Sequence, residues 1–105
     1  MARNIRFHPE FDSDVLAAAD WYDQRQADLG TDFVTNVRKA VSELIADPVR
    51  RTLMEYGIRY WPIGRFPYVV FYDFTDTELV VLGVMHTSQE SDKWQMRGSS
   101  RVTMP

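Results

Sequence analysis

The sequence contains no cysteine, which excludes disulfide bonds, thiolate nucleophiles and cysteine-ligated metal sites. It has only two histidines, His8 and His86, which lie far apart in the sequence and have no histidine partner one helical turn away. We therefore expect no metal site built on histidine. These shortages exclude cysteine-dependent enzymes and count against metal sites built on histidine.

Long apolar runs and the common nucleotide-binding motifs are also missing. No segment approaches about 18 consecutive apolar residues, the length that a membrane-spanning helix needs. No signal-peptide core follows the first residues. Neither a glycine-rich phosphate-binding loop nor the G-x-S-x-G motif of hydrolases occurs. We expect a cytoplasmic protein with no membrane contact and no cofactor.

Positive charge is in modest deficit, because the net charge is −3. This counts against a dedicated nucleic-acid-binding protein, which usually carries a basic excess. Residues 10–28 hold six acids and one base, Arg25, while most of the arginines lie later in the chain. Two interpretations stay open: a pair of solvated surfaces of opposite sign, or an acidic protein with one functional basic face.

What is present is a clear order of periodic segments. Residues 5–8 alternate like a half-buried strand, and Pro9 suits the first turn of a helix. Apolar residues then recur at helical spacing up to Gly30, which we expect as the C-cap of that helix. A second helix is predicted from a cap at Thr31 or Asp32 to a stop at Asp47-Pro48.

The rest of the chain has strand character. Residues 58–63 form a short edge strand interrupted by Pro62, and the runs 68–74 and 78–86 form a hairpin across a polar break at residues 75–77. The last two runs are apolar at nearly every position, as in central strands. The predicted fold is α+β, β-α-α-β-β-β, with an N-terminal helical hairpin packed on one face of a mainly antiparallel sheet.

The length of 105 residues fits one domain. We place this domain at residues 1–97 and expect a flexible C-terminal tail at residues 98–105.

Aromatic and arginine side chains on the sheet and just after it are the candidate contact residues. Tyr68 and Tyr72 share one face of their strand by period-two alternation. The full set is Arg59, Arg65, Tyr68, Tyr72, His86, Trp94 and Arg97. Such a surface suits RNA, through stacking and phosphate contacts, and suits a protein partner equally well. Each of these residues also has a purely structural interpretation, as a core or hydrogen-bonding side chain.

The order of these residues resembles the ParE/RelE superfamily, the toxins of type II toxin–antitoxin (plasmid-stabilisation) modules. The resemblance rests on Phe7-His8-Pro9-Glu10, Trp21-Tyr22, Leu29-Gly30-x-x-Phe33, Gly57-Ile58-Arg59, Arg65-Phe66-Pro67-Tyr68-x-x-x-Tyr72, Val80-Val81-Leu82-x-Val84-x-His86 and Trp94-x-x-Arg97. It implies a cognate antitoxin that binds as a helix in a groove, as an added strand or as both, which makes a hetero-oligomer. It also implies one of two targets: DNA gyrase for ParE-like members, or messenger RNA in the ribosome for RelE-like members.

One departure from the family pattern decides between these targets. Many relatives carry adjacent arginines two and three residues after the histidine, where this chain has Ser88 and Gln89, with Glu90 and Asp92 close by. A ribonuclease needs positioned cations to stabilise charge on the scissile phosphate. We therefore predict a non-enzymatic ParE-like toxin, in which Arg59 and Arg65 pair with acidic groups of the antitoxin or target. A RelE-like ribosome-dependent endonuclease and a degenerate antitoxin-binding module are the alternatives.

Overall fold

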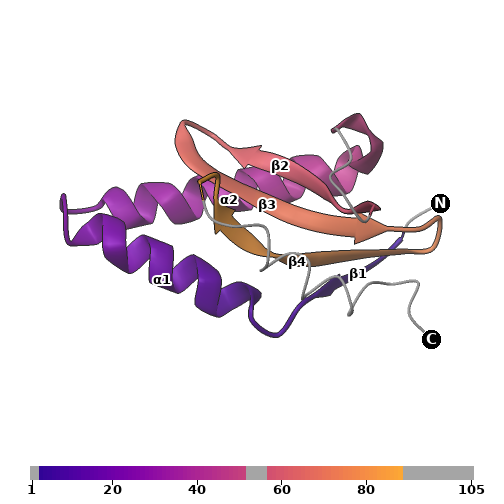
Figure 1. The fold of residues 1–105 in the computed structure, drawn as a ribbon, viewed down its shortest axis with the longest axis horizontal. Helices are drawn as coiled ribbons and strands as arrows, with labels where there is room; N and C mark the ends of the chain where they lie inside the picture. The colour runs from indigo at the N-terminus through magenta and orange to yellow at the C-terminus, as the bar shows by residue number, and fades with distance from the viewer. Residues whose placement is uncertain (1–2, 52–56, 89–105) are drawn as a thin grey trace.

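The computed structural model describes residues 3–51 and 57–88 of the chain. Within them a four-stranded sheet has the order β1-β4-β3-β2 (Figure 1). The strands are β1 (Asn4–Phe7), β2 (Arg59–Ile63), β3 (Phe66–Phe74) and β4 (Glu78–His86). β2, β3 and β4 pair antiparallel, whereas β1 pairs parallel with the first half of β4. The predicted fold class and the edge position of β2 are confirmed.

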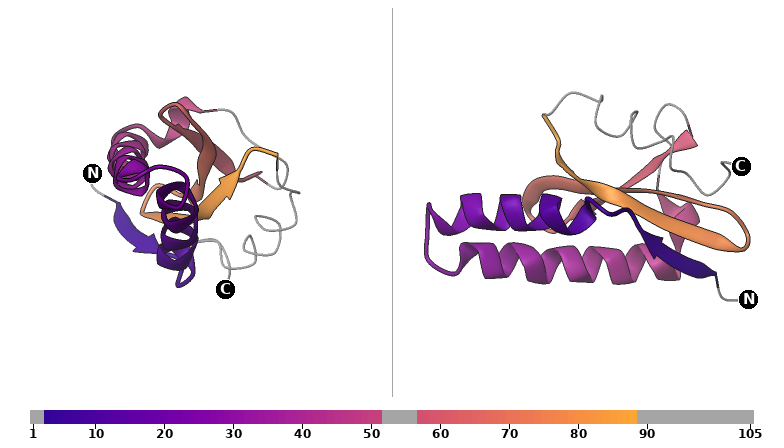
Figure 2. Two further views of the ribbon diagram at one scale, coloured as in Figure 1. Left: turned by 90° about the vertical axis from the view of Figure 1, so that its left-hand side faces the viewer. Right: turned by 90° about the horizontal axis from the view of Figure 1, so that it is seen from below.

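Two antiparallel helices, α1 (Phe11–Asp23) and α2 (Leu29–Ala46), lie side by side on one face of the sheet (Figure 2). The apolar positions of α1 that recur every three or four residues are all buried, which is why this segment folds as an amphipathic helix. α2 ends before Pro48, as predicted, and a short 3-10 turn (Pro48–Arg50) follows.

The predicted helix ends were wrong at three places. α1 begins at Phe11, because the N–H of Phe11 donates to the carbonyl of His8 and Pro9 and Glu10 form a turn outside the helix. α1 already ends at Asp23, and Gly30 is the second residue of α2 rather than a C-cap. Neither Thr31 nor Asp32 caps α2; that position belongs to Asp28, whose φ of 68° is left-handed.

Gly30 is required by the way the two helices meet. Its N–H donates to Oδ1 of Asp23 at 2.7 Å, so the last side chain of α1 satisfies a free donor in the first turn of α2. A Cβ atom at this position would collide with the carbonyl oxygen of Ala19 and the carboxyl group of Asp23. The glycine is therefore required because the two helices approach each other closely here. In the sequence alone, a glycine at this place looks like the end of a helix.

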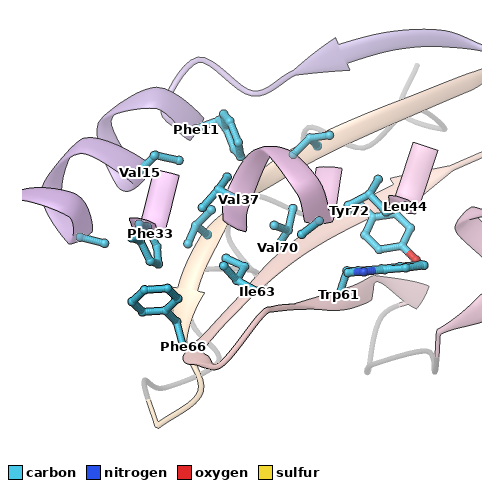
Figure 3. Close-up of a cluster of buried hydrophobic side chains, with 14 of the residues drawn as sticks. Phe11, Val15, Phe33, Val37, Leu44, Trp61, Ile63, Phe66, Val70 and Tyr72 are labelled. Carbon is cyan, nitrogen blue, oxygen red and sulfur yellow. The ribbon is translucent and has the colours of Figure 1, made fainter. Parts of the chain in front are cut away.

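The main core lies between the helical hairpin and the sheet (Figure 3). Phe33, Leu44 and Trp61 are at most 2% exposed, and together with Val70 and Tyr72 they bridge the two layers. A second apolar cluster occupies the opposite face of the sheet, with Ile58, Val69, Phe71, Val80, Leu82 and Met85. Both faces of β3 and β4 are therefore buried, as their nearly continuous apolar sequences predicted.

β4 carries a bulge at Leu82. Phe71 pairs with Gly83 but Tyr72 pairs with Val81, so Leu82 is the extra residue. The bulge comes directly after the last residue of β4 that β1 reaches. Beyond it, α1 replaces β1 as the neighbour of β4, and Oδ2 of Asp14 accepts a hydrogen bond from the N–H of Val84 at 3.0 Å. Among the helices of the described residues, none has the length and apolar character needed to cross a bilayer.

Candidate functional site

Tyr68 and His86 lie together at the end of the sheet near the β2–β3 turn. They are directly paired in the β3–β4 register, and their rings meet edge to face with centroids 5.0 Å apart. Trp21 and Tyr22 of α1 complete the wall of a surface hollow of about 580 Å³, which Pro67 and Ser88 also line. A smaller hollow of about 210 Å³ continues from Trp21 and Tyr68 along α1.

The polar groups of this hollow are held by local hydrogen bonds. Nδ1 of His86 accepts from the N–H of Ser88 at 3.0 Å and lies 2.7 Å from Oγ of the same serine. Since Nδ1 is an acceptor, a neutral His86 carries its proton on Nε2. Burial raises the pKa of Tyr68 and of Tyr22 above the ordinary value, so both hydroxyl groups are neutral at physiological pH.

Trp21 lines this hollow, but the sequence reasoning did not include it among the candidate contact residues. Its side chain is 46% exposed although the ring is large and apolar. The guanidinium carbon of Arg25, one helical turn later, lies over the ring of Trp21 at 3.5 Å from its centroid, which is a cation–π contact. The spacing from Trp21 to Arg25 was the available signal, because side chains four residues apart on a helix are neighbours on its surface.

None of the other predicted contact residues within the described part of the chain lines this hollow. Arg65 is exposed and forms an ion pair with Asp32 at 3.2 Å. Tyr72 is fully buried, and its hydroxyl group donates to the carbonyl of Pro48 at 2.8 Å. Arg59 faces Tyr72 across the β2–β3 pairing. Since Tyr72 follows Tyr68 by four residues of extended chain, about 13 Å separates Arg59 and Tyr72 from the Tyr68–His86 hollow. Trp94, Arg97 and the predicted tail at residues 98–105 lie outside the described residues.

A second surface feature, which sequence reasoning did not find, is an apolar groove between β1 and the helical hairpin. It has a volume of about 570 Å³ and is lined by Phe7, Phe11, Asp12, Val37, Arg38, Val41, Ser42 and Ile45. A neighbouring hollow of about 280 Å³ extends it toward Leu16 and Val34. Phe7 is 46% exposed and Leu16 is 66% exposed, so the groove exposes large apolar side chains to solvent.

A comparison with protein families gave one match that spans most of the chain. The family described as the ParE toxin of the type II toxin–antitoxin system parDE matches residues 5–91. The chain belongs to the ParE toxin family. The predicted resemblance is thereby confirmed, and the molecule is the toxin component of a type II module.

Comparison with solved structures supports the fold of this ParE-family chain. A protein described as the chromosomal ParDE toxin–antitoxin system from P. aeruginosa superimposes with a TM-score of 0.70 and 16% sequence identity, over 80% of this chain and 95% of that chain. At this identity the likeness concerns the fold alone. A search of curated protein sequences gave no significant match.

The ParE-family chain thus carries two distinct surface features on one scaffold. The hollow beside His86 is aromatic, and no arginine or lysine of the described residues lines it. The groove beside β1 is apolar, with one acid and one base, Asp12 and Arg38, on its walls. Aromatic hollows and apolar grooves are features through which proteins bind one another.

Proposed function

We propose that this toxin acts by binding DNA gyrase and has no nuclease activity. The observation that carries the proposal is the composition of the hollow around Tyr68 and His86, which offers aromatic rings and an imidazole but no cationic side chain from the described residues. Cleavage of a phosphodiester builds negative charge that positioned cations must stabilise, and loss of one such donor costs roughly 10²–10³ in rate. Aromatic anchors without cations suit a protein surface instead.

The contact residues of this proposal are Trp21, Tyr68, His86 and Arg65. Trp21 and Tyr68 supply apolar contact area with few rotatable bonds, so little entropy is lost on binding. Arg65 can leave its exposed ion pair with Asp32 and pair with an acidic group of the target at small cost. Exposed ion pairs of this kind contribute little to the free energy of folding. Trp94 and Arg97 remain predictions from the sequence. The proposal places the toxin in the cytoplasm, where bacterial gyrase acts.

The test is induced expression without antitoxin, followed by a supercoiling assay with purified gyrase. We expect filamentous cells with DNA damage and inhibition of gyrase in vitro. Trp21→Ala and Tyr68→Ala should each weaken the inhibition at least tenfold, whereas Val49→Ala, which truncates a side chain that is 61% exposed, should leave it unchanged.

Two outcomes would contradict the proposal. Rapid arrest of translation with cleavage of messages in the ribosomal A site would identify a RelE-like nuclease. Normal growth during expression of folded protein would identify a degenerate antitoxin-binding module.

We further propose that the cognate antitoxin neutralises the toxin by laying an amphipathic segment in the apolar groove. The groove has the form that amphipathic helices bind, since its apolar side chains come from consecutive turns of α2 at Val37, Val41 and Ile45. Co-purification with the product of the adjacent reading frame tests the partnership itself, and absence of a complex would contradict it.

A further inference from the structure

Three arginines gather on aromatic rings at the end of the sheet opposite to the Tyr68–His86 hollow. The guanidinium carbons of Arg3 and Arg59 each lie 5.0 Å from the ring centroid of Phe74. The guanidinium carbon of Arg51 lies 4.6 Å from the ring centroid of Trp61. We refer to Arg3, Arg51 and Arg59 as the arginine cluster.

Hydrogen bonds through Nε fix two of these side chains. Nε of Arg3 donates to the carbonyl of Thr75 at 2.7 Å, and Nε of Arg59 donates to the carbonyl of Arg51 at 3.0 Å. Among the described residues, both side chains therefore bond to the protein through Nε, and no hydrogen bond of their terminal nitrogens is found there. An arginine that is already ordered loses less entropy when it binds a carboxylate.

No member of the arginine cluster forms an ion pair within the described residues. The ion pairs found there are Arg6 with Glu78 and Arg65 with Asp32, and no member of the cluster takes part in either. Nε of Arg51 is buried and has no hydrogen-bond partner in this part of the chain. Burial raises the pKa of Tyr72, and the positive charges of Arg59 and Arg51 partly lower it again.

The arginine cluster and the apolar groove are connected through the same two chain segments. β1 joins Arg3 to Phe7 of the groove, and the end of α2 joins Ile45 of the groove to Arg51. Figure 1 shows the start of β1, the β3–β4 turn and the turn after α2 toward the same end of the molecule. A segment that leaves the groove at this end therefore meets the cluster next.

We propose that the arginine cluster binds carboxylate side chains of an acidic peptide segment that continues from an apolar segment in the groove. A planar guanidinium donates two parallel hydrogen bonds to a carboxylate, which sets the direction of the bound segment as well as its affinity. A peptide fits better than nucleic acid, because three grouped arginines can each hold one carboxylate but are too few to follow a phosphate backbone. This proposal deepens the antitoxin part of the proposed function and rests on it only for the identity of the partner.

The experiment measures fluorescence anisotropy of a fluorescein-labelled oligoglutamate peptide with the purified full chain at low salt. We expect saturable binding that weakens as salt is added. The variant Arg3→Gln/Arg59→Gln should bind roughly tenfold more weakly, which corresponds to about 1.4 kcal/mol. The control variant Arg25→Gln removes an arginine outside the cluster, which is stacked on Trp21 beside the Tyr68–His86 hollow. This variant should bind the peptide like the wild type. Circular dichroism checks that every variant is folded.

Three results would overturn the arginine cluster as a peptide site: no saturable binding, equal weakening in Arg25→Gln, or tighter binding of a short DNA duplex than of the peptide through the same arginines. The assay contains neither antitoxin nor gyrase. Its failure therefore leaves the toxin proposal standing, and failure of the growth and gyrase assays leaves the peptide result standing.

Discussion

Gly30 lies where the start of α2 passes against the end of α1, and two opposing effects act on its replacement by alanine. Alanine is the better helix former by about 1 kcal/mol. Against this, the added methyl group would meet the backbone oxygen of Ala19, which cannot move without shifting α1. Overpacking of this kind costs about 1–3 kcal/mol, so the steric effect is the larger one.

We predict that Gly30→Ala lowers the free energy of unfolding by about 1–2 kcal/mol, measured by urea denaturation. Thr31→Ala, at the exposed next position of the same helical turn, is the control and should change it by less than about 0.5 kcal/mol. A Gly30→Ala variant as stable as the wild type would show that α1 and α2 can separate there without cost.

Tyr72 combines complete burial with a hydroxyl group that donates to Pro48. Burial raises its pKa to about 12, against the smaller opposing effects of Arg59 and Arg51. The unfolded chain has a tyrosine pKa near 10. The neutral hydroxyl therefore stabilises the folded state fully below about pH 10, and this contribution is lost as the pH rises toward about 12.

We predict that Tyr72→Phe lowers the free energy of unfolding by about 1 kcal/mol at neutral pH, because the carbonyl of Pro48 loses its donor. Between pH 10 and about 12 the variant should lose stability less steeply than the wild type. Urea titrations across this range measure both effects. Parallel curves for the two proteins would show that Tyr72 does not titrate with a raised pKa.

At the scale of elements, the bulge at Leu82 divides β4 into two parts with different neighbours. The first part pairs with β1, and the second part uses the carboxylate of Asp14 as the acceptor for the N–H of Val84. α1 thus completes the hydrogen bonding of a strand that would otherwise have an open edge.

We predict that Asp14→Ala destabilises the protein by about 1–3 kcal/mol, because a part-buried N–H group loses its acceptor. Asp14→Asn keeps an oxygen acceptor at the same place and should recover most of the loss. Asp12→Ala removes the other acid of the first turn of α1 and serves as the control for the helix-end charge. Thermal and urea unfolding give the comparison, and equal losses for Asp12→Ala and Asp14→Ala would contradict the role of the hydrogen bond.

Features of the fold that depend on local sequence patterns could be predicted from the sequence. Features that depend on contacts between distant segments could not. Period-two alternation placed Tyr68 and Tyr72 on one face of β3 correctly, and Pro48 marked the end of α2. Alternation cannot tell which layer covers that face, however, and here the helical hairpin covers it and buries Tyr72. The groove was not predictable, because Phe7, Phe11 and Ile45 come from three elements whose relative placement no local pattern gives.

The whole molecule has its aromatic hollow and its apolar groove on different parts of the same scaffold. An antitoxin that binds in the groove, as proposed above, binds only the folded toxin and so stabilises it by mass action. At a free partner concentration one hundred times the Kd, the stabilisation is about 2.7 kcal/mol. The size of this stabilisation measures how tightly the antitoxin binds in the groove, independently of any assay of toxicity.

We predict that Phe7→Gln removes most of the rise in thermal midpoint that the antitoxin produces. The thermal midpoint of the free toxin should change little. Phe7 is 46% exposed and packs on Phe11 with ring centroids 5.1 Å apart, so a polar group there disturbs the groove before the core. Val49→Gln alters an exposed apolar residue outside the groove and should keep the full rise. An equal rise in Phe7→Gln and the wild type would place the antitoxin elsewhere.

The parallel pairing of β1 with β4 has a consequence for synthesis on the ribosome. Asn4 pairs with Glu78, so the first strand leaves the ribosome long before its partner has been made. At about 5–20 residues per second, the wait lasts several seconds. Two of the four aromatic rings that line the hollow, Tyr68 and His86, belong to the last two strands. A nascent chain that stops before Glu78 therefore lacks β4, and with it both the partner of β1 and the His86 wall of the hollow.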